Sequence, residues 1–100
     1  MSRQLVIRPE AESDIAEASK WYEEQDVGLG DQLIDDIRRA VQRAMENPLS
    51  YTLFRKSPQV RRVLARRFPY RIFYIVRTDA VVVFAVLHAA RYDRHWRKRA

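Results

Sequence analysis

The chain has 100 residues, which is room for one domain, and its 47% hydrophobic content is enough for a packed core and argues against disorder. It contains no cysteine, which excludes disulfides, thiolate catalysis and cysteine-ligated zinc. The longest apolar run, Ala80 to Leu87, is far shorter than the roughly 20 residues of a membrane span, and residues 1–8 hold no signal-like apolar run. We therefore expect a single cytoplasmic domain over residues 1–100, with no membrane partner.

The net charge of +6 is distributed unevenly along the chain. Residues 10–47 hold eleven acidic and four basic residues, whereas residues 48–100 hold thirteen basic and two acidic residues. Sixteen of the nineteen basic residues are arginine, whose planar guanidinium pairs in a bidentate manner with phosphate and carboxylate groups. This division favours an acidic or polyanionic macromolecular partner for the C-terminal half, with a merely solubilising surface as the alternative.

The first half of the chain predicts a short strand and two helices. Residues 4–8 alternate as a strand does, and apolar residues then recur at three- and four-residue steps across residues 9–26 and again across residues 31–47. Gly28 and Gly30 mark a tight turn between these two stretches. Because the connection is so short, the two helices should form an antiparallel hairpin.

The second half predicts strands. Residues 49–59 show no periodicity and are expected to form a loop, whereas strand-forming residues dominate 60–67, 70–77 and 80–88. The last of these is almost entirely apolar, which is typical of a strand covered on both faces. Residues 93–99 predict a short helix or tail. The order β-α-α-β-β-β indicates an α+β fold, in which an antiparallel sheet packs against an N-terminal helical hairpin.

Two pairs of adjacent carboxylates, Glu23-Glu24 and Asp35-Asp36, fall within the predicted helices. Paired carboxylates are the groups that glycosidases use for acid and base catalysis. Both pairs are expected on exposed helix faces, so we interpret them as solvated surface groups. The two histidines are not accompanied by cysteine and match no metal-ligand spacing, so no metal site and no cofactor are expected.

A series of short motifs runs through almost the whole chain. They are Pro9-Glu10-Ala11, Asp14-Ile15, Trp21-Tyr22, Gly28-Leu29-Gly30, Asn47-Pro48, Arg66-Arg67-Phe68-Pro69-Tyr70-Arg71, Phe73-Tyr74, Val86-Leu87-His88, Arg91 and Trp96. In this order and spacing they resemble the RelE/ParE toxin superfamily, and its ParE-like branch most closely. The resemblance implies the toxin of a type II toxin–antitoxin pair, which is wrapped and silenced by the C-terminal segment of its antitoxin.

The branches of this superfamily act differently. ParE-like members act on DNA gyrase without a known catalytic constellation, whereas RelE-like members cut mRNA on the ribosome. The resemblance therefore implies a noncatalytic gyrase inhibitor that forms a hetero-oligomer with a cognate antitoxin. A ribosome-dependent mRNA endoribonuclease is the alternative, because fold alone does not decide function.

An endoribonuclease needs a base for the 2′-hydroxyl, an acid for the leaving oxygen and cations for the charge that develops on the phosphorus. The candidates are His88, Arg91 and Tyr92 near the end of the last strand, with arginines of the neighbouring strands as phosphate clamps. A lone histidine after an apolar strand is more often a hydrogen-bonded structural residue. The noncatalytic interpretation assigns no catalytic residue.

The C-terminal segment interleaves basic and aromatic residues, a pattern that suits either nucleic acid or an acidic protein surface. In ParE-like chains this end is implicated in target engagement, so the resemblance implies target binding by Arg91, Arg94, Trp96 and Arg97. The alternative is that Trp96 packs back onto the sheet and the arginines are solvated.

A second group of arginines alternates with apolar residues in the predicted strands. An acidic, amphipathic antitoxin segment would pair with such a surface through charge and apolar anchors. The residues expected to bind the antitoxin are Arg61, Arg62, Arg66 and Arg71.

Overall fold

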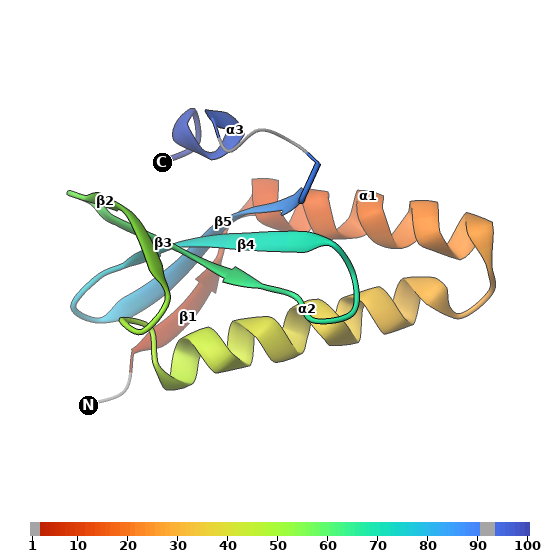
Figure 1. The fold of residues 1–100 in the computed structure, drawn as a ribbon, viewed down its shortest axis with the longest axis horizontal. Coiled ribbons are helices and arrows are strands. Elements are labelled where there is room, and N and C mark those ends of the chain that lie inside the picture. The colour runs from red at the N-terminus through yellow and green to blue at the C-terminus, as the bar shows by residue number, and fades with distance from the viewer. Residues whose placement is uncertain (1–2, 91–93) are drawn as a thin grey trace.

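The computed structural model describes residues 3–90 and 94–100, without the side chains of Arg94 and His95, and it confirms the predicted α+β fold (Figure 1). The elements in chain order are β1 (Gln4–Ile7), α1 (Pro9–Gln25), α2 (Leu29–Glu46), β2 (Thr52–Lys56), β3 (Gln59–Leu64), β4 (Tyr70–Val76), β5 (Ala80–His88) and α3 (Arg94–Arg97). The strands form one sheet in the order β1-β5-β4-β3-β2.

The sheet is mixed and contains one strand more than the sequence predicts. Residues 52–56, expected as part of a loop, form β2, which pairs antiparallel with β3 at the edge of the sheet. The strand is only five residues long and mostly exposed, so it leaves no hydrophobic alternation in the sequence. At the other edge, β1 pairs in parallel with β5, while the remaining pairs are antiparallel.

Apolar clusters cover both faces of the sheet. On one face, the buried stripe of α2, which includes Leu33, Ile37 and Ala44, packs with α1 against the sheet. On the opposite face, which we call the outer face, Phe73 and Phe84 cluster beneath α3. In Figure 1, α2 and α3 accordingly lie on opposite sides of the sheet. The double coverage of β5 confirms the prediction from its nearly continuous apolar sequence.

The helical hairpin is organised around its turn. Gly28 adopts a left-handed conformation, with φ of 93°, that disfavours residues with a side chain. The exposed carboxylate of Glu23 accepts hydrogen bonds from the backbone N–H groups of Gly28 and Gly30 at 3.0–3.1 Å. These bonds satisfy amides at the start of α2 that have no partner within the helix. Glu23 is thus on the surface as predicted but also stabilises the turn.

Asp36 corrects the prediction that both members of the Asp35-Asp36 pair are solvated. Asp35 is exposed, whereas Asp36 is only 2% exposed. Its carboxylate accepts backbone hydrogen bonds from Arg66, Arg67 and Phe68 at 3.3, 2.9 and 2.8 Å, in the turn between β3 and β4. The turn amides have no strand partner, and Asp36 supplies the missing acceptor.

Within the described ranges, no helix combines the length and the apolar character that crossing a bilayer requires.

Candidate functional site

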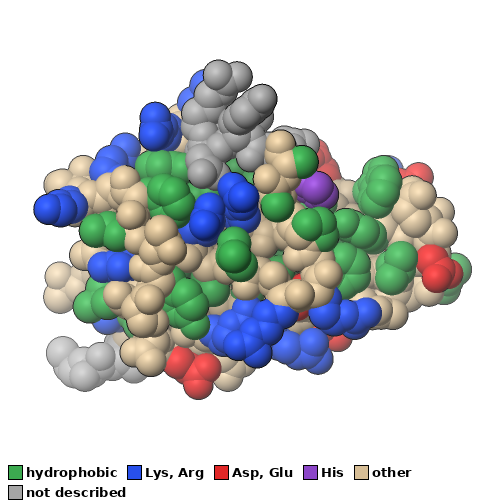
Figure 2. All heavy atoms as spheres, viewed as in Figure 1, with side chains coloured by type: hydrophobic (Ala, Val, Ile, Leu, Met, Phe, Trp, Pro, Cys, Tyr) green, Lys and Arg blue, Asp and Glu red, His purple; other side chains and the backbone are tan. Residues whose placement is uncertain are grey.

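The outer face of the sheet joins an apolar centre to arginines. Arg62 of β3 lies opposite Phe73, and Arg71 of β4 lies opposite Leu87, so both arginines share a face with the apolar cluster beneath α3. The guanidinium of Arg62 lies 4.9 Å from the centre of the Phe54 ring, within the range of a cation–π contact. The side of the molecule seen in Figure 2 carries many Lys and Arg side chains and few acidic ones.

Trp96 of α3 closes this face. Its ring is 2% exposed, stacks on Phe73 at 5.8 Å between centroids, and also contacts Phe54 and Phe84. The guanidinium of Arg97, an exposed residue, lies 5.6 Å from the ring centre. The alternative in which Trp96 packs back onto the sheet is therefore confirmed, and Arg97 remains at the surface beside it.

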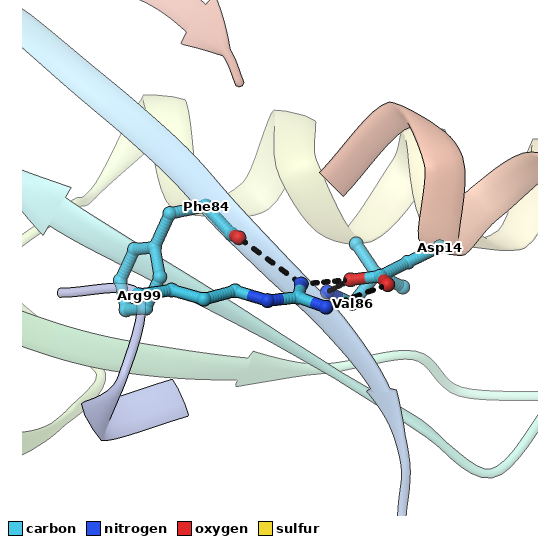
Figure 3. A network of polar contacts seen from close by, with 4 residues as sticks. All are labelled: Asp14, Phe84, Val86 and Arg99. Carbon is cyan, nitrogen blue, oxygen red and sulfur yellow. Dashed lines mark hydrogen bonds and ion pairs between the residues drawn. The ribbon is translucent and has the colours of Figure 1, made fainter. Parts of the chain in front are cut away.

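An ion pair fastens the C-terminal residues to α1 (Figure 3). Both terminal nitrogens of Arg99 donate to the carboxylate of Asp14, and Asp14 also accepts the backbone N–H of Val86 at 2.9 Å. β1 ends at Ile7, opposite Val83, so among the described residues no strand pairs with β5 beyond Val83 on the β1 side. The hydrogen bond to Asp14 raises the pKa of Arg99, so the guanidinium stays protonated in the ion pair.

Sequence reasoning missed this ion pair. The sequence motifs include Asp14 but assign it no partner, and Arg99 falls in a C-terminal segment that is recognised only as basic and aromatic. The two residues are 85 positions apart, and no local pattern connects them.

The four arginines expected to bind an antitoxin do not form one surface. Arg61 lies on the helix side, opposite Tyr74, and donates to the carbonyl of Tyr51 at 2.7 Å. Arg66 is exposed in the turn after β3. Only Arg62 and Arg71 share the outer face.

His88, the candidate base of the alternative function, lies on the helix side of the sheet. It is half-buried opposite Tyr70, with ring centroids 5.3 Å apart, and its Nδ1 accepts the backbone N–H of Ala90 at 3.0 Å. A bulge in β5 produces this orientation, because Val83 and Val86, three residues apart, both face the helices. Arg91 and Tyr92, the other candidates, lie outside the described residues, as does the side chain of Arg94.

No group of three or more His, Asp or Glu side chains in the described part of the chain is placed to hold a metal ion. The arrangement therefore offers a contact surface formed by Arg62, Arg71, Arg97 and the exposed side chain of Leu64, which pairs with Arg71, while the cluster around Trp96 is buried beneath it.

Comparison with known proteins places this geometry in a family. No curated protein matches the chain in sequence. A solved structure described as the chromosomal ParDE TA system from P. aeruginosa is similar in fold, with a TM-score of 0.76 over 87% of this chain and 96% of that chain, at 15% identity. The family model described as the ParE toxin of the type II toxin–antitoxin system parDE matches residues 5–92. The chain therefore belongs to the ParE toxin family of type II toxin–antitoxin systems.

Proposed function

We propose that this protein is a noncatalytic toxin that inhibits DNA gyrase in the cytoplasm and is neutralised by a cognate antitoxin in a hetero-oligomer. Family membership supports the toxin role, and the structurally similar protein belongs to a ParDE toxin–antitoxin system. The observation that carries the noncatalytic assignment is that the sheet separates His88 from Arg62 and Arg71.

The separation weakens the endoribonuclease alternative on chemical grounds. A phosphate held by the outer-face arginines would have the sheet between it and His88. In addition, Nδ1 of His88 already accepts a hydrogen bond, so in the neutral ring Nε2 carries the proton and offers no lone pair to a 2′-hydroxyl. Both points favour binding over bond cleavage.

We propose that the C-terminal segment binds the target, gyrase. Arg91, Arg94 and Arg97 would supply the cations, and Trp96, which is buried, would hold α3 in position rather than contact gyrase itself. For the antitoxin, Arg62 and Arg71 would pair with acidic side chains while Leu64, exposed on the same face, contacts an apolar anchor. Arg61 and Arg66 would contribute only at the margins of this contact.

The target is tested by adding purified toxin to gyrase with supercoiled DNA and, separately, to translating ribosomes with mRNA. We expect inhibited or DNA-trapped gyrase and intact mRNA. Arg97→Glu should raise the inhibitory concentration about tenfold, whereas Lys98→Glu, an equal charge change at the adjacent exposed residue, should have a smaller effect. Site-specific mRNA cuts that disappear in His88→Ala would overturn the proposal in favour of the endoribonuclease.

The antitoxin proposal is tested by co-expressing the toxin with a candidate antitoxin, purifying the complex and measuring its dissociation rate. Reversing charge at both Arg62 and Arg71 should speed dissociation of the complex by at least about tenfold, because acidic partner groups would then face like charge. The double variant Arg39→Glu/Arg77→Glu, at exposed positions on α2 and in the β4–β5 turn, makes the same charge change and serves as the matched control. Equal dissociation rates for both variants would exclude the outer face as the antitoxin site.

A further inference from the structure

A hollow lies between α1 and the C-terminal half of β5, away from the outer face. It consists of two neighbouring cavities of about 240 and 410 Å³, and both are lined by Trp21, Tyr70 and His88. Glu17 and Asp14 complete the wall of the smaller cavity. We call this hollow the Trp21 cleft. Its size suits one long side chain rather than a helix.

Trp21 is held in place by aromatic contacts although more than half of it is exposed to solvent. The side chain is 56% exposed, yet the ring makes an edge-to-face contact with Tyr22 at 5.0 Å, and Tyr22 in turn contacts Phe68 at 5.0 Å. These contacts orient the ring before any partner arrives, which lowers the entropy cost of binding. Rigid, partly exposed tryptophans are typical anchors of protein interfaces.

Two carboxylates, those of Asp14 and Glu17, line the cleft. No Lys or Arg lines either cavity among the described residues. Asp14 is already engaged by Arg99 and by the Val86 amide. Glu17 is exposed and, in the described part of the chain, makes no hydrogen bond or ion pair. It precedes Trp21 by four residues in α1, so its carboxylate and the indole lie on the same helix face.

The exposed Trp21 ring and the Glu17 carboxylate together favour a cationic ligand over an anionic one. A phosphate or carboxylate would meet the like charge of Glu17, and the neighbouring cation, Arg99, is already engaged by Asp14. A cation would meet the negative face of an indole and the Glu17 carboxylate, which makes no hydrogen bond or ion pair among the described residues. We propose that the Trp21 cleft binds an arginine or lysine side chain presented by a partner protein, with its cationic group over the Trp21 ring and beside the Glu17 carboxylate. This site is separate from the basic outer face and is independent of the gyrase proposal.

The chain contains only two tryptophans, which makes a direct test possible. Two indole N–H signals are expected in a ¹H–¹⁵N spectrum of the full chain, one from exposed Trp21 and one from buried Trp96, and Trp21→Phe assigns them. The probe is the peptide acetyl-Gly-Arg-Gly-amide, compared with the same peptide containing citrulline, which has nearly the same shape but no charge. We expect the Arg peptide to shift the Trp21 signal saturably and to leave the Trp96 signal unchanged.

The citrulline peptide and Glu17→Gln should each weaken binding by about two- to fivefold, the range for a partly exposed cation–π contact or ion pair. Glu12→Gln, on the exposed surface of the same helix, should bind as the wild type does. An absent shift, equal binding of the citrulline peptide, or unchanged affinity in Glu17→Gln would each overturn the proposal.

Discussion

At the scale of single residues, polar groups with defined partners hold the turns of this fold in place. Asp36 receives three consecutive backbone amides of the β3–β4 turn, and Tyr74 donates its hydroxyl to the carbonyl of Pro48 at 2.8 Å. Each interaction attaches a loop to a buried position in a regular element. Loss of either partner would leave a buried polar group unsatisfied, which costs more than the bond itself contributes.

Asp36→Ala should lower the free energy of unfolding by about 2–3 kcal/mol, because three turn amides lose a charged acceptor. Asp35→Ala should change it by less than about 0.5 kcal/mol, because among the described residues Asp35 takes part only in an exposed ion pair with Arg38. Urea unfolding of both variants measures the difference. Equal losses at the two adjacent positions would show that the turn does not depend on Asp36.

Burial raises the pKa of Tyr74 above its ordinary value of 10.0. Above pH 10 the unfolded chain therefore releases the phenol proton while the folded chain retains it, so the stability associated with Tyr74 is lost as pH rises. Tyr74→Phe should lower stability near neutral pH by about 1 kcal/mol, through loss of the bond to Pro48. Its stability should also decline less between pH 10 and 12 than that of the wild type, as measured by urea unfolding at each pH.

At the scale of elements, close contact between α1 and α2 depends on a residue without a side chain. A Cβ placed on Gly30 would lie 2.8 Å from the carbonyl oxygen of Ser19 and 3.0 Å from the Glu23 carboxylate that caps the turn. The backbone of α1 cannot yield as a flexible side chain would. Gly30 therefore sets the spacing of the hairpin, while Gly28 sets its direction through its left-handed conformation.

Gly30→Ala should destabilise the protein by about 1–3 kcal/mol, although alanine is the better helix former, because the overlap with Ser19 forces the two helices apart. Thermal unfolding provides the measurement. Gly28→Ala tests the cost of the left-handed backbone conformation rather than of a steric overlap. Open space surrounds Gly28, so only its backbone conformation opposes a side chain. A stabilised Gly30→Ala variant would contradict the close approach of the helices.

At the scale of the whole molecule, a small domain is stabilised by apolar clusters on both faces of one sheet. A chain of this length buries a modest fraction of its surface, so each cluster matters to the whole. The cluster on the outer face is completed by Trp96, which arrives from a helix of only four residues. The Arg99–Asp14 ion pair then fastens this segment to the first helix.

Trp96→Ala should reduce the free energy of unfolding by about 3–5 kcal/mol and expose the apolar outer face, which is detected by increased binding of a hydrophobic dye. Trp21→Ala provides the control, because Trp21 is 56% exposed and its loss should cost only about 1–2 kcal/mol. If both substitutions cost the same, Trp96 is not part of the core in solution.

The sequence by itself determined the features that depend on neighbouring residues. Apolar spacing identified α1 and α2, the two glycines identified their turn, and the continuous apolar run of residues 80–88 identified a strand buried on both faces. The ParE-like family was also apparent from short motifs in order. Each of these signals is local, because helix and strand periods are properties of consecutive residues.

Only the tertiary structure decided which residues meet. It paired Asp14 with Arg99 and Asp36 with a turn some thirty residues away, and it recruited residues 52–56 as an edge strand. It also placed His88 on the helix side of the sheet, away from the outer-face arginines. Simple alternation from Val81 would have put His88 on the outer face, but the bulge in β5 reverses its orientation. Long-range pairing and the side that a residue faces depend on register and bulges, which periodicity within one segment does not encode.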